Sequence, residues 1–98
     1  MNLTKCLADR GISDGVRVSA VNPGSIRTER LTSRIERMAT ERAISLEEAE
    51  RRMTESMRIS RFGESAEIAD LVAFLASDRA SYLQGAIIDA DGGHTRTL

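Results

Sequence analysis

The sequence predicts an α/β protein in which two short strands, separated by helices, form a parallel pair. The segments at residues 16–21 and 86–90 are short and rich in β-branched residues, and residues 26–60 and 66–77 carry apolar residues at helical spacing. Parallel neighbours need a long crossover connection, and the helices between these segments supply one. The length of 98 residues fits a single domain over residues 1–98.

The first element is a helix, expected over residues 1–11. Leu3, Cys6 and Leu7 stand at positions i, i+3 and i+4, which places them on one helical face. Gly11 then offers a residue that adopts positive φ at little cost, so the helix is predicted to end there.

The first strand is expected over residues 16–21. Val16 and Val18 alternate with polar neighbours, as in a half-buried strand. Pro23 and Gly24 follow it, and this pair predicts a sharp break at the end of the strand.

Residues 26–60 are predicted to hold two amphipathic helices. In the first, Leu31 and Ile35 have helical spacing among charged and small polar residues. The second begins at Ser45, which forms a capping-box pattern with Glu48. Both helices are therefore expected to bury one apolar face.

A further helix is predicted over residues 66–77, with Ser65 as its cap. Its buried stripe is expected to consist of Ile68, Leu71, Val72 and Leu75. The second strand is predicted over residues 86–90. Because two strands do not form a stable sheet alone, the chain is expected to need further strands beside this pair.

Composition excludes several classes of function. Fourteen basic and fifteen acidic residues leave a net charge of −1, so no strong positive field favours nucleic acid or an anionic membrane. One cysteine, Cys6, and one histidine, His94, are too few for a disulfide or for a zinc site from one chain. The first residues lack the pattern of a signal peptide, and a cytoplasmic location is expected.

The sequence offers no catalytic residues and no metal site of its own. It contains neither of the common glycine-rich phosphate loops. Tyr82 is the only tyrosine, and the residue four positions later is Ala86 rather than a lysine. No acid/base constellation is therefore predicted.

Four motifs in order carry a resemblance to a known family. They stand at residues 18–28, with Asn22-Pro23-Gly24, at 61–69, at 74–78, and at 85–93, with Asp91-Gly92-Gly93. In this order and spacing they closely resemble the C-terminal portion of short-chain dehydrogenases/reductases. The resemblance implies the C-terminal part of a Rossmann-like, doubly wound parallel sheet without its N-terminal half, in which the two strands are the sixth and seventh.

The resemblance also implies a cofactor, NAD or NADP, and the residues that contact it. Pro23 and Gly24 form the turn that lies against the nicotinamide, the backbone of Ile26 bonds its carboxamide, and the Thr28 hydroxyl bonds the same group or a phosphate. Thr28 is equally suited to cap the next helix, and both roles are compatible.

For the substrate, the resemblance implies a carbonyl or an alcohol that is covered by the helices of residues 26–60. Leu31 and Ile35 are the expected substrate contacts. The methionines of these helices are expected in the helix core rather than in a pocket. A homo-oligomer is also implied.

The sequence and this resemblance lead to three hypotheses about function. The first is an oxidoreductase segment that is inactive alone, because the family's catalytic tyrosine and lysine and its glycine-rich loop are not in this sequence. The second is an interaction fragment that pairs with intact family subunits. The third is an autonomous small α/β binding module, which a core of two strands makes hard to stabilise.

Overall fold

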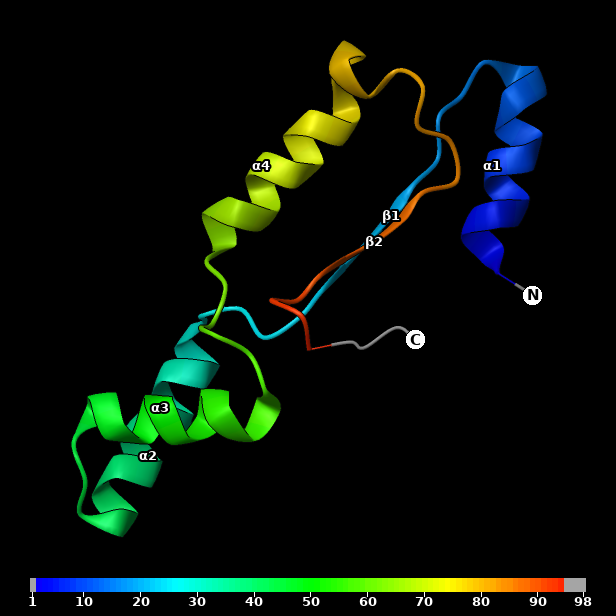
Figure 1. Ribbon diagram of the computed structural model, residues 1–98. Helices are drawn as coiled ribbons and strands as arrows, with labels where there is room; N and C mark the ends of the chain where they lie inside the picture. The colour runs from blue at the N-terminus through cyan, green and yellow to red at the C-terminus, as the bar shows by residue number, and fades with distance from the viewer. Residues whose placement is uncertain (1, 95–98) are drawn as a thin grey trace. The chain divides into compact units, whose positions relative to one another are not determined.

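The computed structural model describes residues 2–94 and has the predicted α/β architecture (Figure 1). The elements in order are α1 (Leu3–Asp14), β1 (Ala20–Pro23), α2 (Glu29–Arg42), α3 (Leu46–Met57), α4 (Ser65–Ala76), a 3₁₀ turn (Asp78–Ala80) and β2 (Ile87–Ala90). β1 and β2 pair in parallel, with Ala20 opposite Ile87 and Pro23 opposite Ala90. The predicted parallel pair with a helical crossover is confirmed.

The chain forms two compact units. The strand unit contains the residues up to Pro23 together with Ala66–Ala90, and the helix-pair unit contains Gly24–Ser65 and the residues from Asp91. The partial domain over residues 1–98 stays a prediction, and the hydrophobic core cluster lies within Gly24–Ser65. Each unit is described separately below.

In the strand unit, helix α1 continues past its predicted end. Gly11 is buried inside the helix, where an added Cβ would lie 2.2 Å from the carbonyl oxygen of Val16. The helix ends instead at Gly15, which has φ 72° and donates its N–H to the Gly11 carbonyl. The prediction of an end at Gly11 was wrong because this glycine serves close packing rather than termination.

Strand β1 is shorter and later than the predicted 16–21. The Val18 N–H donates to Oε1 of Gln84 at 2.9 Å, so a side chain rather than a strand neighbour satisfies it. The same Gln84 donates from Nε2 to the carbonyl oxygens of Ala8 (2.6 Å) and Val16 (3.0 Å). Before the strand begins at Ala20, the Val18 carbonyl also accepts a hydrogen bond from the Gly85 N–H at 2.7 Å.

Helix α4 contains the four residues of the predicted apolar stripe, but no residue of this helix is buried. Val72 is 51% exposed, although the sequence places it among the buried positions. A sheet of two strands offers too little surface to cover the stripe. Among the described residues, no helix combines the length and apolarity that crossing a membrane requires.

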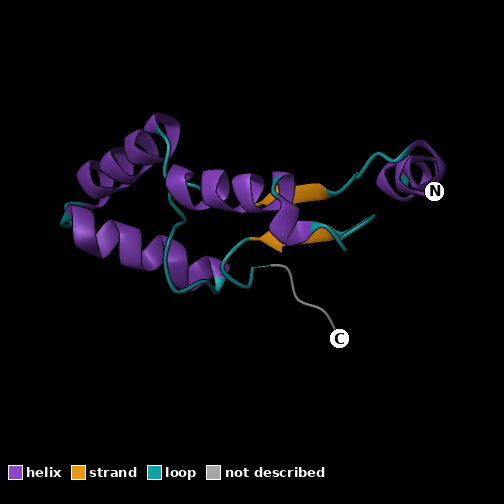
Figure 2. Cartoon of the chain, turned by 90° about the horizontal axis from the view of Figure 1, so that it is seen from above, coloured by secondary structure: helices purple, strands orange, loops and turns teal. Residues whose placement is uncertain are grey.

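The hydrophobic core lies in the helix-pair unit, where α2 packs on α3 (Figure 2). Its buried members are Leu31, Ile35, Ala39, Ala49, Ile59 and Phe62. Met38, Met53 and Met57 pack against this core, as expected. Leu46 is 55% exposed, since it stands at the first position of α3 and lies outside the stripe that faces α2.

Helix α3 begins and is braced as its sequence indicates. The Ser45 side chain accepts a hydrogen bond from the Glu48 N–H at 3.0 Å, which confirms the cap. The Glu48 carboxylate also accepts from Arg51 and Arg52, one turn further along the helix. These two guanidinium groups lower the pKa of Glu48 from 4.5 to about 2.

This pKa predicts an acid-sensitive helix. The carboxylate pKa is lower in the folded chain, so its stabilising effect is present above pH 4.5 and is lost as the pH falls towards about 2. Replacing Glu48→Gln is expected to reduce the loss of far-ultraviolet circular dichroism across this range. Glu47→Gln, on the same helix turn, is the control, and an equal reduction by both variants would contradict the assignment.

Candidate cofactor-binding site

The predicted cofactor segment, residues 23–28, leaves the carboxyl end of β1. Pro23 is the last residue of the strand and stands opposite Ala90. Because proline has no N–H to donate, it is tolerated where the pairing ends. In open α/β sheets, ligands bind beyond the carboxyl ends of the strands, and this segment starts at such an end.

Gly24 is required by a close contact with the chain that follows β2. An added Cβ at Gly24 would lie 2.5 Å from Cβ and 2.6 Å from Cα of Asp91. No side chain fits there without a shift of the Asp91 backbone. The glycine of the predicted motif therefore sets the path by which the segment leaves the strand.

The backbone of Ile26 is presented by a parallel bridge to Gly63. The Arg27 N–H donates to the Gly63 carbonyl at 2.8 Å, and the Gly63 N–H donates to the Ser25 carbonyl at 3.0 Å. This pattern turns the N–H and carbonyl of Ile26 away from Gly63. Within residues 2–94, neither group forms a backbone hydrogen bond. Ile26 thus offers one donor and one acceptor, spaced as in a strand edge.

Thr28 caps helix α2. Its Oγ1 accepts a hydrogen bond from the Leu31 N–H at 3.2 Å, and its own backbone is extended. The capping role that the sequence left open is confirmed. Since the oxygen accepts, the hydroxyl proton remains able to donate to a ligand, and the cofactor contact stays a prediction.

Loss of this cap has a defined expected effect. Thr28→Val is expected to lower the free energy of unfolding by about 1 kcal/mol, because one N–H at the start of α2 loses its acceptor. Thr28→Ser keeps the oxygen and is expected to stay near the wild-type value. Urea unfolding followed by circular dichroism measures both variants, and equal losses would exclude the hydroxyl as the cause.

Arg27, for which the sequence predicts no role, forms ion pairs with two glutamates. Nη1 lies 2.7 Å from Oε1 of Glu50 on α3, and Nε lies 3.0 Å from Oε1 of Glu64. The guanidinium also stands over the Phe62 ring, 6.0 Å from its centroid. The bonds to Glu50 and then to Glu64 raise the pKa of Arg27 above its usual value.

The two predicted substrate contacts have different surroundings. Leu31 and Ile35 are both buried in the core of the helix pair, so the structure shows a packing role for each. Ile35 in addition lines an open pocket of about 190 Å³, together with Arg27, Thr32, Glu36, Leu46, Glu47 and Glu50. The substrate contact stays a prediction for both residues.

Tyr82 is fully exposed. Among the described residues, no group of three or more histidine, cysteine, aspartate or glutamate side chains is arranged to hold a metal ion. The groups that the candidate segment presents are the backbone N–H and carbonyl of Ile26 and the hydroxyl of Thr28.

The parallel strands and the helices between them define the chain as an α/β protein. Residues 1–95 match the family model described as enoyl-(acyl carrier protein) reductase. The chain belongs to the short-chain dehydrogenase/reductase family.

Relatives of known identity agree with this membership. The chain is 34% identical over all its 98 residues to the NADPH-dependent reductase BacG of Bacillus subtilis, of which it covers 38%. It is 38% identical over 93 residues to acetoacetyl-CoA reductase of Shinella zoogloeoides, covering 95% of this chain and 34% of that one. The chain thus spans little more than a third of the length of these relatives.

A solved structure supports the fold. L-sorbose reductase of Gluconobacter frateurii, determined with NADPH and L-sorbose, matches with a TM-score of 0.82 and 30% identity. The match covers 97% of this chain and 36% of that one. The chain therefore has part of a Rossmann-like fold, as the sequence predicts.

Proposed function

We propose that residues 23–28 hold the nicotinamide end of NAD or NADP in an oxidoreductase that acts on a carbonyl or alcohol substrate. The observation that carries this proposal is the outward-facing N–H and carbonyl pair of Ile26, presented beyond the end of β1. A carboxamide has one acceptor oxygen and a donor nitrogen, so it complements this pair. The NADPH named for BacG and for the sorbose reductase structure supports the same cofactor class.

Each residue of the segment has a separate task. The Ile26 N–H donates to the carboxamide oxygen, and its carbonyl accepts from the carboxamide nitrogen. The Thr28 hydroxyl donates to a second acceptor of the cofactor, while its oxygen keeps the cap on α2. Gly24 has no side chain, which lets the backbone of the segment pass close to Asp91. A bound nicotinamide nucleotide supplies or takes the hydride.

The substrate is proposed to meet the helix pair. Ile35 is the better placed of the two expected contacts, because it lines the open pocket. The relatives named above act on a coenzyme A thioester and on a sugar, and both kinds of carbonyl are candidates. Since the sequence holds no tyrosine–lysine pair, we expect this 98-residue chain to bind without catalysing. A cytoplasmic location and the absence of nucleic-acid partners stay predictions.

The test is a titration of NADPH and NADH followed by nucleotide fluorescence. Ile26→Pro removes the N–H and is expected to weaken binding by about tenfold, the cost of about one hydrogen bond. Ile26→Val keeps the backbone donor and controls for the side chain, and circular dichroism verifies that both variants remain folded. Equal affinities for the two variants would contradict the proposal.

A second candidate function is self-association, with a second copy of the chain as the partner. The observation that favours it is the exposure of the apolar stripe on α4. Val72→Glu is expected to reduce the association measured by analytical ultracentrifugation, whereas Ala73→Glu, beside the stripe, is the control. Sedimentation as a monomer at every concentration would contradict this candidate.

A further inference from the structure

The basic residues of helix α2 lack the acidic partners that those of α3 have. Arg30 and Arg34 stand one turn apart, and no acidic residue lies three or four positions from either. Among residues 2–94 neither of them forms an ion pair. On α3, by contrast, Arg51 pairs with Glu48 and Glu55. Like charges at this spacing repel each other, so the arrangement on α2 is unfavourable by itself.

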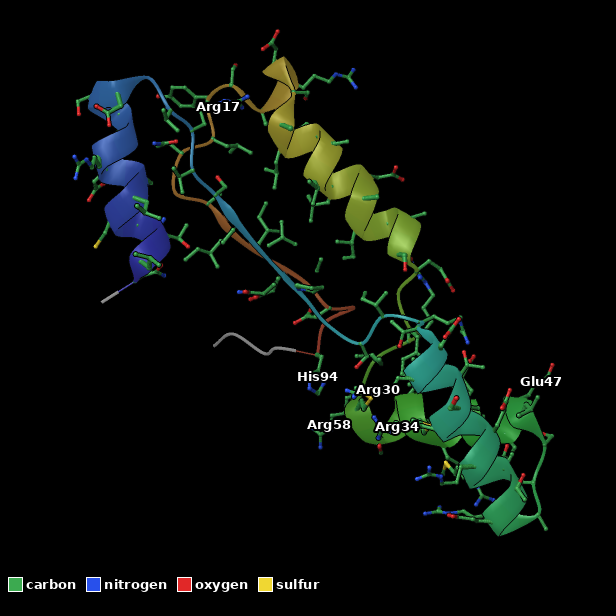
Figure 3. All side chains as sticks on the ribbon, turned by 180° about the vertical axis from the view of Figure 1, so that it is seen from behind. Arg17, Arg30, Arg34, Glu47, Arg58 and His94 are labelled. Atoms are coloured by element: carbon green, nitrogen blue, oxygen red, sulfur yellow. The ribbon has the colours of Figure 1, made fainter. Side chains whose placement is uncertain are left out.

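Two further basic groups lie at the same place. Arg58 ends α3 in a left-handed conformation with φ 59°. Met57 is the residue before Arg58, and its carbonyl oxygen accepts a hydrogen bond from Nδ1 of His94 at 3.0 Å. In the view of Figure 3 the side chains of Arg30, Arg34, Arg58 and His94 are seen together near the end of α3. These four residues are the basic patch, and all belong to the helix-pair unit. The sulfur of Met57 lies 3.9 Å from Oγ of Ser25, so the end of α3 lies near the segment that leads into α2.

The basic patch lies beside the candidate cofactor segment. Arg30 follows Thr28 by two residues, and the sulfur of Met57 lies 3.9 Å from Oγ of Ser25. A ligand on the patch is therefore within reach of the groups that are proposed to hold the nicotinamide end. This location suits the binding of the charged part of a reacting molecule better than the binding of a regulator at a remote site.

We propose that the basic patch binds the phosphate groups of a phosphorylated substrate, of the coenzyme A thioester kind. Guanidinium groups bind phosphate through paired, charge-assisted hydrogen bonds, and several of them at one place match a ligand with several phosphates. Among residues 2–94, Arg30 and Arg34 have no acidic partner, and an uncharged sugar would not supply one. The inference rests on the proposed function, since it selects between the two substrate kinds considered there.

The same phosphate chemistry occurs in the cofactor, and the experiment separates the two sources. Coenzyme A, dephospho-coenzyme A and NADPH are titrated separately into the 98-residue chain by isothermal calorimetry at low salt. The Arg30→Gln/Arg34→Gln variant is expected to weaken coenzyme A binding at least about tenfold, because each lost guanidinium removes a charge-assisted bond. Its affinity for NADPH is expected to be unchanged.

The control is Arg42→Gln, which removes a cation at the other end of the same helix. It is expected to leave the coenzyme A affinity near the wild-type value, and circular dichroism verifies the helix content of each variant. Loss of NADPH binding in the double variant would assign the patch to the cofactor and overturn the proposal. Absence of coenzyme A binding to the wild-type chain, or equal binding by the double variant, would also overturn it.

Failure of the proposed function gives a different result. If the wild-type chain binds coenzyme A through the patch but NADPH does not bind at all, the cofactor segment is misassigned while the patch stands. If NADPH binds and coenzyme A does not, the reverse holds. The two readouts therefore fail independently.

Discussion

Replacing Phe62 by alanine is expected to lower the free energy of unfolding of the helix-pair unit by about 3–5 kcal/mol. Phe62 is 1% exposed and packs in the core with Leu31 and Ile35. It also lies beneath the Arg27 guanidinium. The substitution removes apolar burial, leaves a cavity and takes away the ring that supports Arg27, so its effect combines three losses.

The matched control is Phe74→Ala on α4, where the phenylalanine is 43% exposed. A half-exposed ring has less burial to lose, and we expect a cost of about 1 kcal/mol or less. Urea unfolding with circular dichroism measures both variants. Similar losses in the two would show that the helix pair has no core of its own and would contradict the division into units.

Replacing Gly24 by alanine is expected to weaken NADPH binding by about one to two factors of ten. The added Cβ meets Asp91 at 2.5–2.6 Å, so the backbone of one segment must move, and such overpacking costs about 1–3 kcal/mol. Gly24 does not have positive φ, so the effect is steric rather than conformational. The displacement falls on the segment that presents Ile26.

The control for this variant is Gly15→Ala. Gly15 has φ 72°, but nothing lies within 4 Å of the added Cβ. The expected cost is about 1 kcal/mol of backbone strain, with no change in NADPH affinity. Fluorescence titration compares the two, and a loss of affinity in both would show that general destabilisation explains the Gly24 result.

The helices α2 and α3 were predictable from sequence because their determinants are local. The spacing of Leu31 and Ile35 and the cap at Ser45 act within a few residues of each other. The predicted end of α1 and the predicted start of β1 were wrong because contacts between residues far apart in the sequence decide both positions. Gly11 packs against Val16, and Gln84 satisfies Val18 from 66 residues away.

The candidate site was predictable only as a motif. The sequence identifies Pro23, Gly24, Ile26 and Thr28, and of these only the capping role of Thr28 follows from local rules. The outward-facing groups of Ile26 depend on a bridge to Gly63, which no local pattern indicates. The ion pairs of Arg27 could not be predicted for the same reason, because its two partners lie 23 and 37 residues away in the chain.

The most direct test of the account is an NMR titration of the ¹⁵N-labelled chain with NADPH. We expect the resonance of the Ile26 amide, which faces away from the bridge, to shift strongly as NADPH is added. The Arg27 and Gly63 amides, which are already bonded within the bridge, are expected to move much less. Saturation by NADPH with no shift at Ile26, or with the largest shifts far from residues 23–28, would contradict the assignment of this segment to the cofactor.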